Sequence, residues 1–158
     1  CLKADGTIDL SQTELMVKAI KDKGGEAVFH RAFDCVKDPF QAAEQLISLG
    51  VDRILTSGLK SKAPDGWRLL KELQERFGER IEILAGSGIH AGNAGELAEK
   101  TGVRQLHSSC KDWIADPTTV GEDVSYSYAD SDHASCFEVV ARDKVAELLA
   151  VVRKLDIY

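Results

Sequence analysis

Apolar and polar residues follow one another in a repeating order along the chain. Four short segments with apolar centres cover residues 27–32, 51–56, 81–85 and 103–108, and each is followed by polar residues or glycine. Segments with helical periodicity separate them. Short apolar runs bounded by turn residues are typical of strands buried on both faces, as in a parallel sheet. The pattern therefore predicts an α/β fold with four parallel strands, adjacent in chain order.

The first helical segment carries a start signal and an apolar stripe. Ser11 followed by Glu14 fits a capping box, in which each side chain accepts a hydrogen bond from the other residue's backbone. Apolar positions then recur at helical spacing and are expected to face the core: Leu15, Met16, Ala19 and Ile20. The pair Gly24-Gly25 is expected to end this helix.

Further helices are predicted between the strands and at the end of the chain. Asp38 as the N-cap, with Pro39 at the first helical position, starts the second helix. Others are expected over residues 66–77, 91–100 and 138–155. The polar residues 111–135 are predicted to form a connection that contains a long exposed loop. No break in composition divides the chain, so residues 1–158 are predicted to form a single domain.

Charge and composition narrow the range of partners. The net charge is −6 and 44% of the 158 residues are hydrophobic, as in an ordinary globular protein. An acidic chain is unsuited to nucleic acid or to anionic membranes, so neither is an expected partner. The chain contains no apolar run of the roughly 18 residues that a membrane helix needs, and no visible signal peptide. The four widely spaced cysteines are then expected to be reduced thiols.

Polar groups follow each predicted strand. In a parallel sheet all these groups meet at one edge, which is where α/β folds place their chemistry. On one strand alone, His30 and Asp34 could simply satisfy each other or a loop. Four convergent sets favour a binding or catalytic site. The groups are His30, Arg31, Asp34 and Cys35, then Thr56, Ser57 and Gly58, then Gly86, Ser87 and Gly88, and finally His107, Ser108, Ser109 and Cys110.

The segment Gly86-Ser87-Gly88 suits an anion. Glycines let the backbone approach a ligand closely, and the free N–H groups at a following helix start carry partial positive charge. A phosphate seat is therefore one interpretation of this segment. A tight strand-to-helix turn requires the same glycines, and that interpretation stays open.

The first strand offers an acid–base pair and a cation. His30 could act as a general base that Asp34 orients, while Arg31 holds an anion. Strand parity places His30 and Asp34 on one face of a regular strand, with Arg31 beside Phe29 on the other. Arg31 therefore either packs its stem against the helices or lies beyond the regular strand.

Three soft or borderline ligands lie at the same predicted edge. Cys35, Cys110 and His107 suit copper(I) or zinc. They come from the first and fourth strands and lack the close spacing of metal-binding motifs, so structural thiols are the alternative.

Four segments together resemble a known family. They are Phe29-His30-Arg31-Ala32-Phe33-Asp34, Arg53-Ile54-Leu55-Thr56-Ser57-Gly58, Ala85-Gly86-Ser87-Gly88-Ile89 and His107-Ser108-Ser109. In this order they are similar to the CutC copper homeostasis family. Residues 1–9 also resemble the loop after that family's fourth strand.

The resemblance implies a TIM (β/α)8-barrel fold, a cytoplasmic protein and a role in copper handling. Only the second half of the family's eight units is matched, so a partial barrel with about four parallel strands and flanking helices is expected. Its implied site residues are His30, Arg31, Asp34, Thr56, Ser57, Gly86, Gly88, His107 and Ser108.

Three functions stay open after this resemblance. The first is copper(I) handling through Cys35, Cys110 and His107. The second is a barrel enzyme acting on a small anionic or phosphorylated substrate, and the third is an inactive half-barrel. The unpaired edges of four strands also predict a homo-oligomer.

Overall fold

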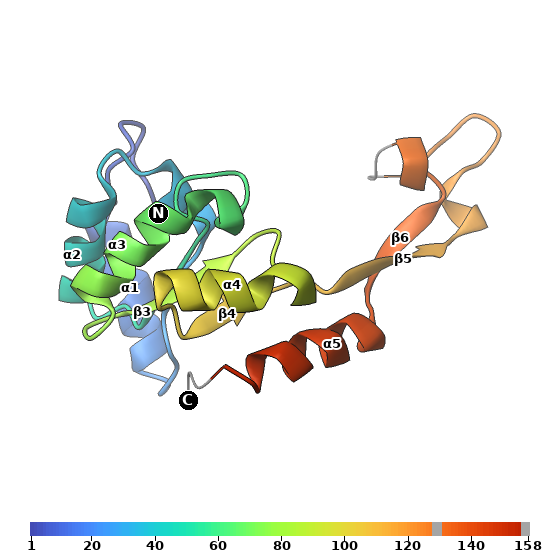
Figure 1. Cartoon of the computed structure of the whole chain (residues 1–158). Coiled ribbons are helices and arrows are strands. Elements are labelled where there is room, and N and C mark those ends of the chain that lie inside the picture. The colour runs from blue at the N-terminus through green and yellow to red at the C-terminus, as the bar shows by residue number, and fades with distance from the viewer. Residues whose placement is uncertain (128–130, 156–158) are drawn as a thin grey trace.

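The computed structural model describes residues 1–127 and 131–155. Its main sheet has four parallel strands in the order β1-β2-β3-β4 (Figure 1). They are β1 Val28–Phe29, β2 Arg53–Thr56, β3 Glu82–Gly86 and β4 Gln105–His107. The predicted α/β class, the parallel pairing and the adjacency in chain order are confirmed.

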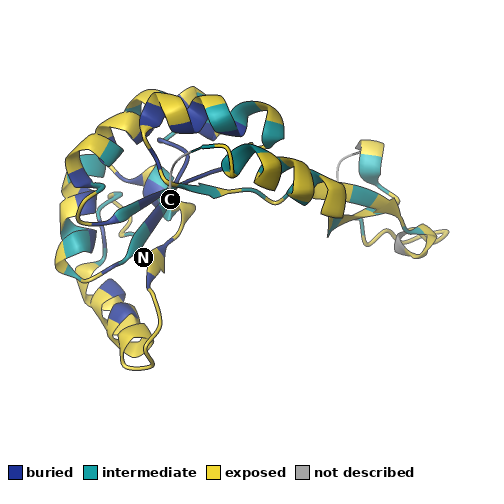
Figure 2. Ribbon diagram, turned by 60° about the horizontal axis from the view of Figure 1, so that its bottom comes forward, coloured by how far each residue is buried: buried dark blue, intermediate teal, exposed yellow. Residues whose placement is uncertain are grey.

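The helices lie on one side of this sheet. They are α1 Leu10–Lys21, α2 Pro39–Ser48, α3 Trp67–Phe77 and α4 Ala91–Thr101. Figure 2 shows a crescent with these helices on the convex side and the strands on the concave side. This is about half of a closed (β/α) barrel, because a complete one has eight strands and a full ring of helices.

The sheet is fully buried only on its helix-facing side. Phe29, Ile54 and Ile83 stand in register across β1, β2 and β3, and all three are buried. The preceding residues in the same register are Val28, Arg53 and Glu82, and these are partly or largely exposed on the opposite side. The prediction that both faces of each strand are buried is therefore wrong. Four βα units form only one side of a barrel, so within the described residues no second set of strands covers the opposite face.

Helix α1 begins earlier than predicted and turns a different face to the core. Its N-cap is Asp9, whose side chain accepts from the backbone N–H of Gln12 at 3.1 Å, so the capping box at Ser11 is wrong. The buried side chains are those of Thr13 and Val17. The predicted buried stripe of Leu15, Met16, Ala19 and Ile20 is exposed.

The first strand is shorter than predicted. After Phe29 the chain turns at His30 into a short 3-10 helix, η1 (Arg31–Cys35). Strand parity therefore does not apply beyond Phe29, and Arg31 lies outside the regular strand. By contrast, Asp38 caps α2 with Pro39 at its start, as predicted.

The last part of the chain departs most from the prediction. Lys111–Ala115 forms β5, which pairs antiparallel with β6, Cys136–Val140. The predicted polar connection thus begins as a strand, and the predicted final helix starts only after β6, as α5 (Arg142–Val152). Figure 1 shows the hairpin projecting from the crescent, while α5 returns to pack against α4. Residues 128–130 of the predicted loop lie outside the described residues.

Among the described helices, none combines the length and apolar character needed to span a bilayer.

Candidate functional site

The carboxylate of Asp34 organises the carboxyl end of the sheet. It lies in η1, directly after β1, and its side chain is only 8% exposed. It accepts hydrogen bonds from Thr56 Oγ1 at 2.6 Å, from the Ser57 backbone N–H at 2.9 Å and from Ser57 Oγ at 2.9 Å. The Leu59 N–H donates to it at 3.2 Å. One carboxylate therefore fixes the loop that follows β2.

Asp34 also holds Arg31 in place. Arg31 Nε donates to Asp34 Oδ2 at 2.8 Å, and its Nη2 donates to Ser57 Oγ at 2.7 Å. Burial alone would raise the pKa of Asp34, but the hydrogen bonds from Thr56, Ser57 and Arg31 outweigh it and lower the pKa below its usual value. Asp34 is therefore a charged anchor, and the guanidinium of Arg31 is held in a fixed position.

The structure does not pair His30 with Asp34. His30 caps η1, and its Nδ1 accepts from the Ala32 backbone N–H at 3.0 Å. The carboxylate of Asp34 accepts hydrogen bonds from Arg31, Thr56, Ser57 and Leu59, so Asp34 does not orient His30 as expected. The carboxylate positions Arg31 instead.

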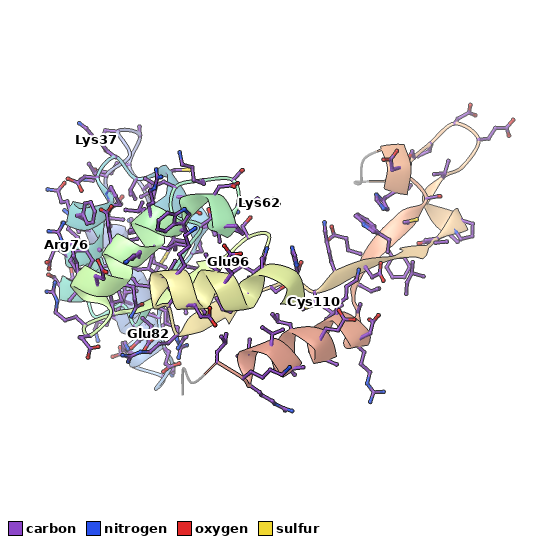
Figure 3. All side chains as sticks on the ribbon, in the orientation of Figure 1. Lys37, Lys62, Arg76, Glu82, Glu96 and Cys110 are labelled. Carbon is purple, nitrogen blue, oxygen red and sulfur yellow. The ribbon has the colours of Figure 1, made fainter. Side chains whose placement is uncertain are left out.

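A pocket of about 670 Å³ opens beside this network. It lies between the loops after β3 and β4 and the start of the hairpin and α5. Its lining comes from four parts of the chain: Arg31 and Lys62 with Leu55; Ser87 to Gly92; His107 to Lys111; and Glu138, Lys144 and Glu147. In Figure 3, Cys110 marks the root of the hairpin and Lys62 lies on the side of the body nearest to it.

The loop after β3 has the backbone shape of an anion seat. Ser87 and Gly88 both have left-handed backbone conformations, with φ of +85° and +71°. Their carbonyl oxygens are occupied, since they accept from the Ala63 N–H and from Asn93 Nδ2. The parallel pairing of Gly86 with His107 engages the Ser87 N–H, whereas the Gly88 N–H donates to no protein acceptor within residues 1–127 and 131–155. A free N–H on a glycine that precedes a helix is suited to an anion.

Lys62 lies against this loop. A Cβ atom at position 88 would stand 2.6 Å from Cδ of Lys62, so only glycine leaves room for the lysine stem. Lys62 is exposed and forms no ion pair within the described part of the chain. By contrast, Lys111 pairs with Glu138 and Lys144 pairs with Asp112. Lys62 is therefore the cation of the pocket most available to a ligand, and Arg31 adds a guanidinium that Asp34 already pairs and orients.

Ser108 and Cys110 close the pocket after β4. Ser108 Oγ donates to the Ile89 carbonyl oxygen at 2.6 Å and accepts from the Cys110 N–H at 3.2 Å. Its hydroxyl therefore ties the end of β4 to the loop before α4. Cys110 has φ of +43°, which is strained for a side chain with a Cβ atom. Leu59 and Ser87 also have positive φ, so three strained residues follow three neighbouring strands.

The predicted site residues divide into three groups. Those that line the pocket are Arg31, Ser87, Gly88, His107, Ser108 and Cys110. Asp34, Thr56 and Ser57 lie behind it and hold Arg31. His30, Gly86 and Cys35 are not in its lining. Gly86 instead leaves room for the side chain of Leu55, since a Cβ atom at position 86 would lie 2.6 Å from Leu55 Cδ1.

Sequence reasoning missed several pocket residues. Lys62 lies in the loop after β2, and His90 lies two positions after Gly88, so both had a positional signal. Glu138 and Lys144 had none, because β6 and α5 come back to the pocket only through the hairpin.

The predicted metal ligands do not come together. His107 and Cys110 line the pocket, but Cys35 is exposed elsewhere. Nowhere in the described residues do three His, Cys, Asp or Glu side chains gather closely enough for a metal ion. The expected set of Cys35, Cys110 and His107 is therefore wrong, because only His107 and Cys110 share the pocket. These two residues do not fit a closed copper or zinc centre.

Comparison with known proteins assigns the chain to a family. The model of the CutC family matches residues 1–112. The chain belongs to the CutC family. A CutC family protein from Glaesserella parasuis is 48% identical over 110 residues, which are 70% of this chain and 44% of that protein. One from Treponema denticola is 37% identical over 149 residues, covering 94% of this chain and 60% of the relative.

A solved structure supports the same assignment. The crystal structure of CutC from Streptococcus agalactiae gives a TM-score of 0.62 at 34% identity, over 67% of this chain and 51% of that one. A KDPGal structure gives a TM-score of 0.53 over 94% of this chain and 56% of that one, but at 12% identity it shows the fold alone. The chain therefore spans about half the length of the curated CutC relatives it matches.

Proposed function

We propose that this CutC family chain takes part in copper homeostasis and that its pocket binds a small anionic ligand. The first part rests on family membership, which extends over residues 1–112. The second rests on the pocket. The chain spans about half the length of its relatives. Both parts of the proposal are therefore made for this chain alone, and the experiments below use this chain.

One observation carries the anionic ligand: two cations, Arg31 and Lys62, line the pocket together with the free N–H of Gly88. The guanidinium of Arg31 is fixed by Asp34, and Lys62 packs its stem on Gly88. A fixed cation loses little side-chain entropy when a ligand binds. Together with the amide of Gly88, these groups suit the oxygens of a phosphate or of a carboxylate.

Copper would be cargo here, and the pocket lining holds three side chains of the type that binds copper(I): the thiol of Cys110 and the imidazoles of His107 and His90. Within the described residues, no three such side chains lie close enough together to hold a metal ion. The anionic ligand is therefore the function that the pocket supports best.

Calorimetric titration with inorganic phosphate tests the anion site. Lys62→Gln removes the available charge and is expected to weaken phosphate binding about tenfold, or ~1.4 kcal/mol. Lys37→Gln is the matched control, because it removes the same charge at a position that Figure 3 shows far from Lys62. Equal losses in both variants would mean that phosphate responds only to net charge, and would contradict the site.

Two substitutions of Gly88 separate charge from strain. Gly88→Ala forces a side chain into a left-handed conformation and against Lys62. Gly88→Asp does the same and adds a negative charge, so it is expected to weaken phosphate binding beyond the alanine variant. Identical titrations for the two variants would argue against an anion at this loop.

Copper homeostasis is tested in cells. A bacterial strain that lacks its own CutC gene and grows poorly in copper is expected to regain growth when it expresses this chain. Expression of the chain at the same level without any gain in growth would contradict the proposal.

A further inference from the structure

His90 lies where the loop after β3 meets α4, and its exposed side chain lines the pocket. It is the N-cap of α4, and its Nδ1 accepts a hydrogen bond from the Gly92 backbone N–H at 3.1 Å. A ring nitrogen that accepts a hydrogen bond carries no proton, so in the neutral imidazole the proton sits on the other nitrogen, Nε2. The start of α4 therefore fixes His90 as an Nε2–H donor.

Gly92 shows that the imidazole is folded over the first turn of α4. A Cβ atom at position 92 would stand 3.1 Å from Cε1 and 3.2 Å from Nδ1 of His90. Glycine thus gives the ring room beside the N–H from which it accepts. Within residues 1–127 and 131–155, Nε2 of His90 has no hydrogen-bond partner. The ring therefore has one nitrogen committed to the helix and one free for a ligand.

Asn93 ties His90 to the loop before it. Its Oδ1 accepts from the His90 backbone N–H at 2.9 Å, and its Nδ2 donates to the Gly88 carbonyl oxygen at 2.9 Å. One side chain therefore holds both ends of the turn between β3 and α4. The Gly88 N–H and the His90 Nε2–H, two donors of the pocket, thus belong to one hydrogen-bonded unit.

We propose that His90 is a ligand-binding residue of the anion site, which donates from Nε2 to an anionic oxygen, and that it is not a metal ligand. The inference rests on the proposed anionic ligand. A histidine that ligates a metal through one ring nitrogen almost always donates a proton from the other. For His90 to ligate through Nε2, its proton would have to move to Nδ1, where it would meet the Gly92 N–H and break the helix cap.

The charges around His90 also favour an anion over a metal ion. The stem of Lys62 lies against Gly88, because a Cβ atom at position 88 would stand 2.6 Å from Lys62 Cδ. Ala91, the first residue of α4, lines the pocket, and its backbone N–H donates to no acceptor within the described residues. The N-terminus of an 11-residue helix adds partial positive charge on this side of the pocket. These groups attract an anion and repel copper(I).

Two substitutions at position 90 separate the donor from the helix cap. Asparagine is among the best N-cap residues, so His90→Asn keeps an acceptor for the Gly92 N–H and removes the Nε2–H. His90→Ala removes both groups. Calorimetric titration is expected to show inorganic phosphate bound about tenfold more weakly by both variants than by wild type. Only His90→Ala is expected to unfold at lower urea. Full phosphate affinity in His90→Asn would assign His90 to the helix cap alone and overturn the proposal.

Titration with copper(I) tests the exclusion of a metal. His90→Asn is expected to bind copper(I) as wild type does, because His90 is not a ligand. A variant that loses copper(I) affinity and keeps its phosphate affinity would assign His90 to the metal and overturn the proposal.

Long-range proton–nitrogen NMR correlation spectra show directly which ring nitrogen carries the proton. The chain has four histidines, and His90→Asn identifies the signals of His90 by their loss. At about pH 8, where an ordinary imidazole is neutral, the proton is expected on Nε2, and the Nε2 signal is expected to shift when phosphate is added. A proton on Nδ1 would overturn the proposal.

The same spectra distinguish failure of this inference from failure of the proposed function. A wild-type chain with its proton on Nε2 that binds no phosphate would refute the proposed function, and the donor role of His90 with it. A wild-type chain that binds phosphate without a shift of the Nε2 signal would refute the role of His90 and leave the proposed function standing.

Discussion

The body of the chain, residues 1–110, and the hairpin arm, residues 111–140, are built in different ways. Among the described residues, the buried apolar side chains all lie in the body, between Ile8 and Val103. The arm exposes large apolar residues on its strands and its loop, among them Ile114, Val124 and Tyr126. In Figure 2 the body contains dark blue segments, while the arm is yellow and teal.

The family match divides at the same place, because it ends at residue 112. The body thus carries both the core and the residues that define the family. The arm is a two-stranded sheet held by a few surface contacts, including a 2.6 Å ion pair between Lys111 and Glu138 and the stacking of Trp113 on His133. A two-stranded hairpin alone is marginally stable in water. Body and arm should therefore respond differently to the same change.

The largest expected difference comes from one substitution made in both regions. Ile54 is fully buried in β2, whereas Ile114 of β5 is 48% exposed. Ile54→Ala is expected to lower the free energy of unfolding by about 2–5 kcal/mol, because it leaves a cavity in the core. Ile114→Ala is expected to change it by less than about 0.5 kcal/mol. Urea denaturation at one protein concentration measures both, and equal losses would show that the arm shares the core.

The next difference concerns two aspartates. Asp34→Asn removes a carboxylate that accepts from Thr56, Ser57 and Arg31, and it leaves Arg31 unpaired. A loss of about 2 kcal/mol in the free energy of unfolding is expected. Asp112→Asn in the arm is the isosteric control, and its urea midpoint is expected to stay at the wild-type value. A wild-type midpoint for Asp34→Asn would refute the anchoring role of Asp34.

The stability that Asp34 supplies should depend on pH. Its pKa in the folded chain is lowered from the ordinary 3.8, because hydrogen bonds to the carboxylate outweigh the effect of burial. A lowered pKa contributes stability above the unfolded pKa, and this contribution is lost as the pH falls through the folded pKa. The gap between wild type and Asp34→Asn is thus expected to be full at pH 7 and to shrink below about pH 4. Urea midpoints across this range measure it, and a constant gap would contradict the assignment.

The smallest expected effect is a difference between body and arm in the urea concentration at which tryptophan fluorescence changes. The chain has two tryptophans, and Trp67 starts α3 in the body while Trp113 lies in the arm. Trp113→Phe leaves a reporter for the body, and Trp67→Phe leaves one for the arm. The arm reporter is expected to change at lower urea than the body reporter, because hairpin and core unfold separately. Coincident transitions would show that body and arm form one cooperative unit.

Local sequence determined the sheet and part of the site. Short apolar runs between turn residues indicate parallel strands independently of residues distant in the sequence. Asp38-Pro39 starts a helix through contacts within three residues. The strands in turn place Ser87, Gly88, His107 and Ser108 at one edge, since every parallel strand ends there. The family motifs lie in these same segments.

Tertiary structure determined which residues, distant along the chain, come into contact with one another. Arg31 lies three positions from Asp34 in the same short 3-10 helix. The groups of Thr56, Ser57 and Leu59 that fix the carboxylate lie 22 to 25 positions away, beyond the reach of any local pattern. Lys62, Glu138 and Lys144 reach the pocket through loops and the hairpin. The apolar stripe of α1 is visible in the sequence, but whether it is buried depends on what lies opposite. Hydrophobic burial is not directional, and a stripe at Leu15 and Met16 stays exposed where the fold provides no surface to cover it.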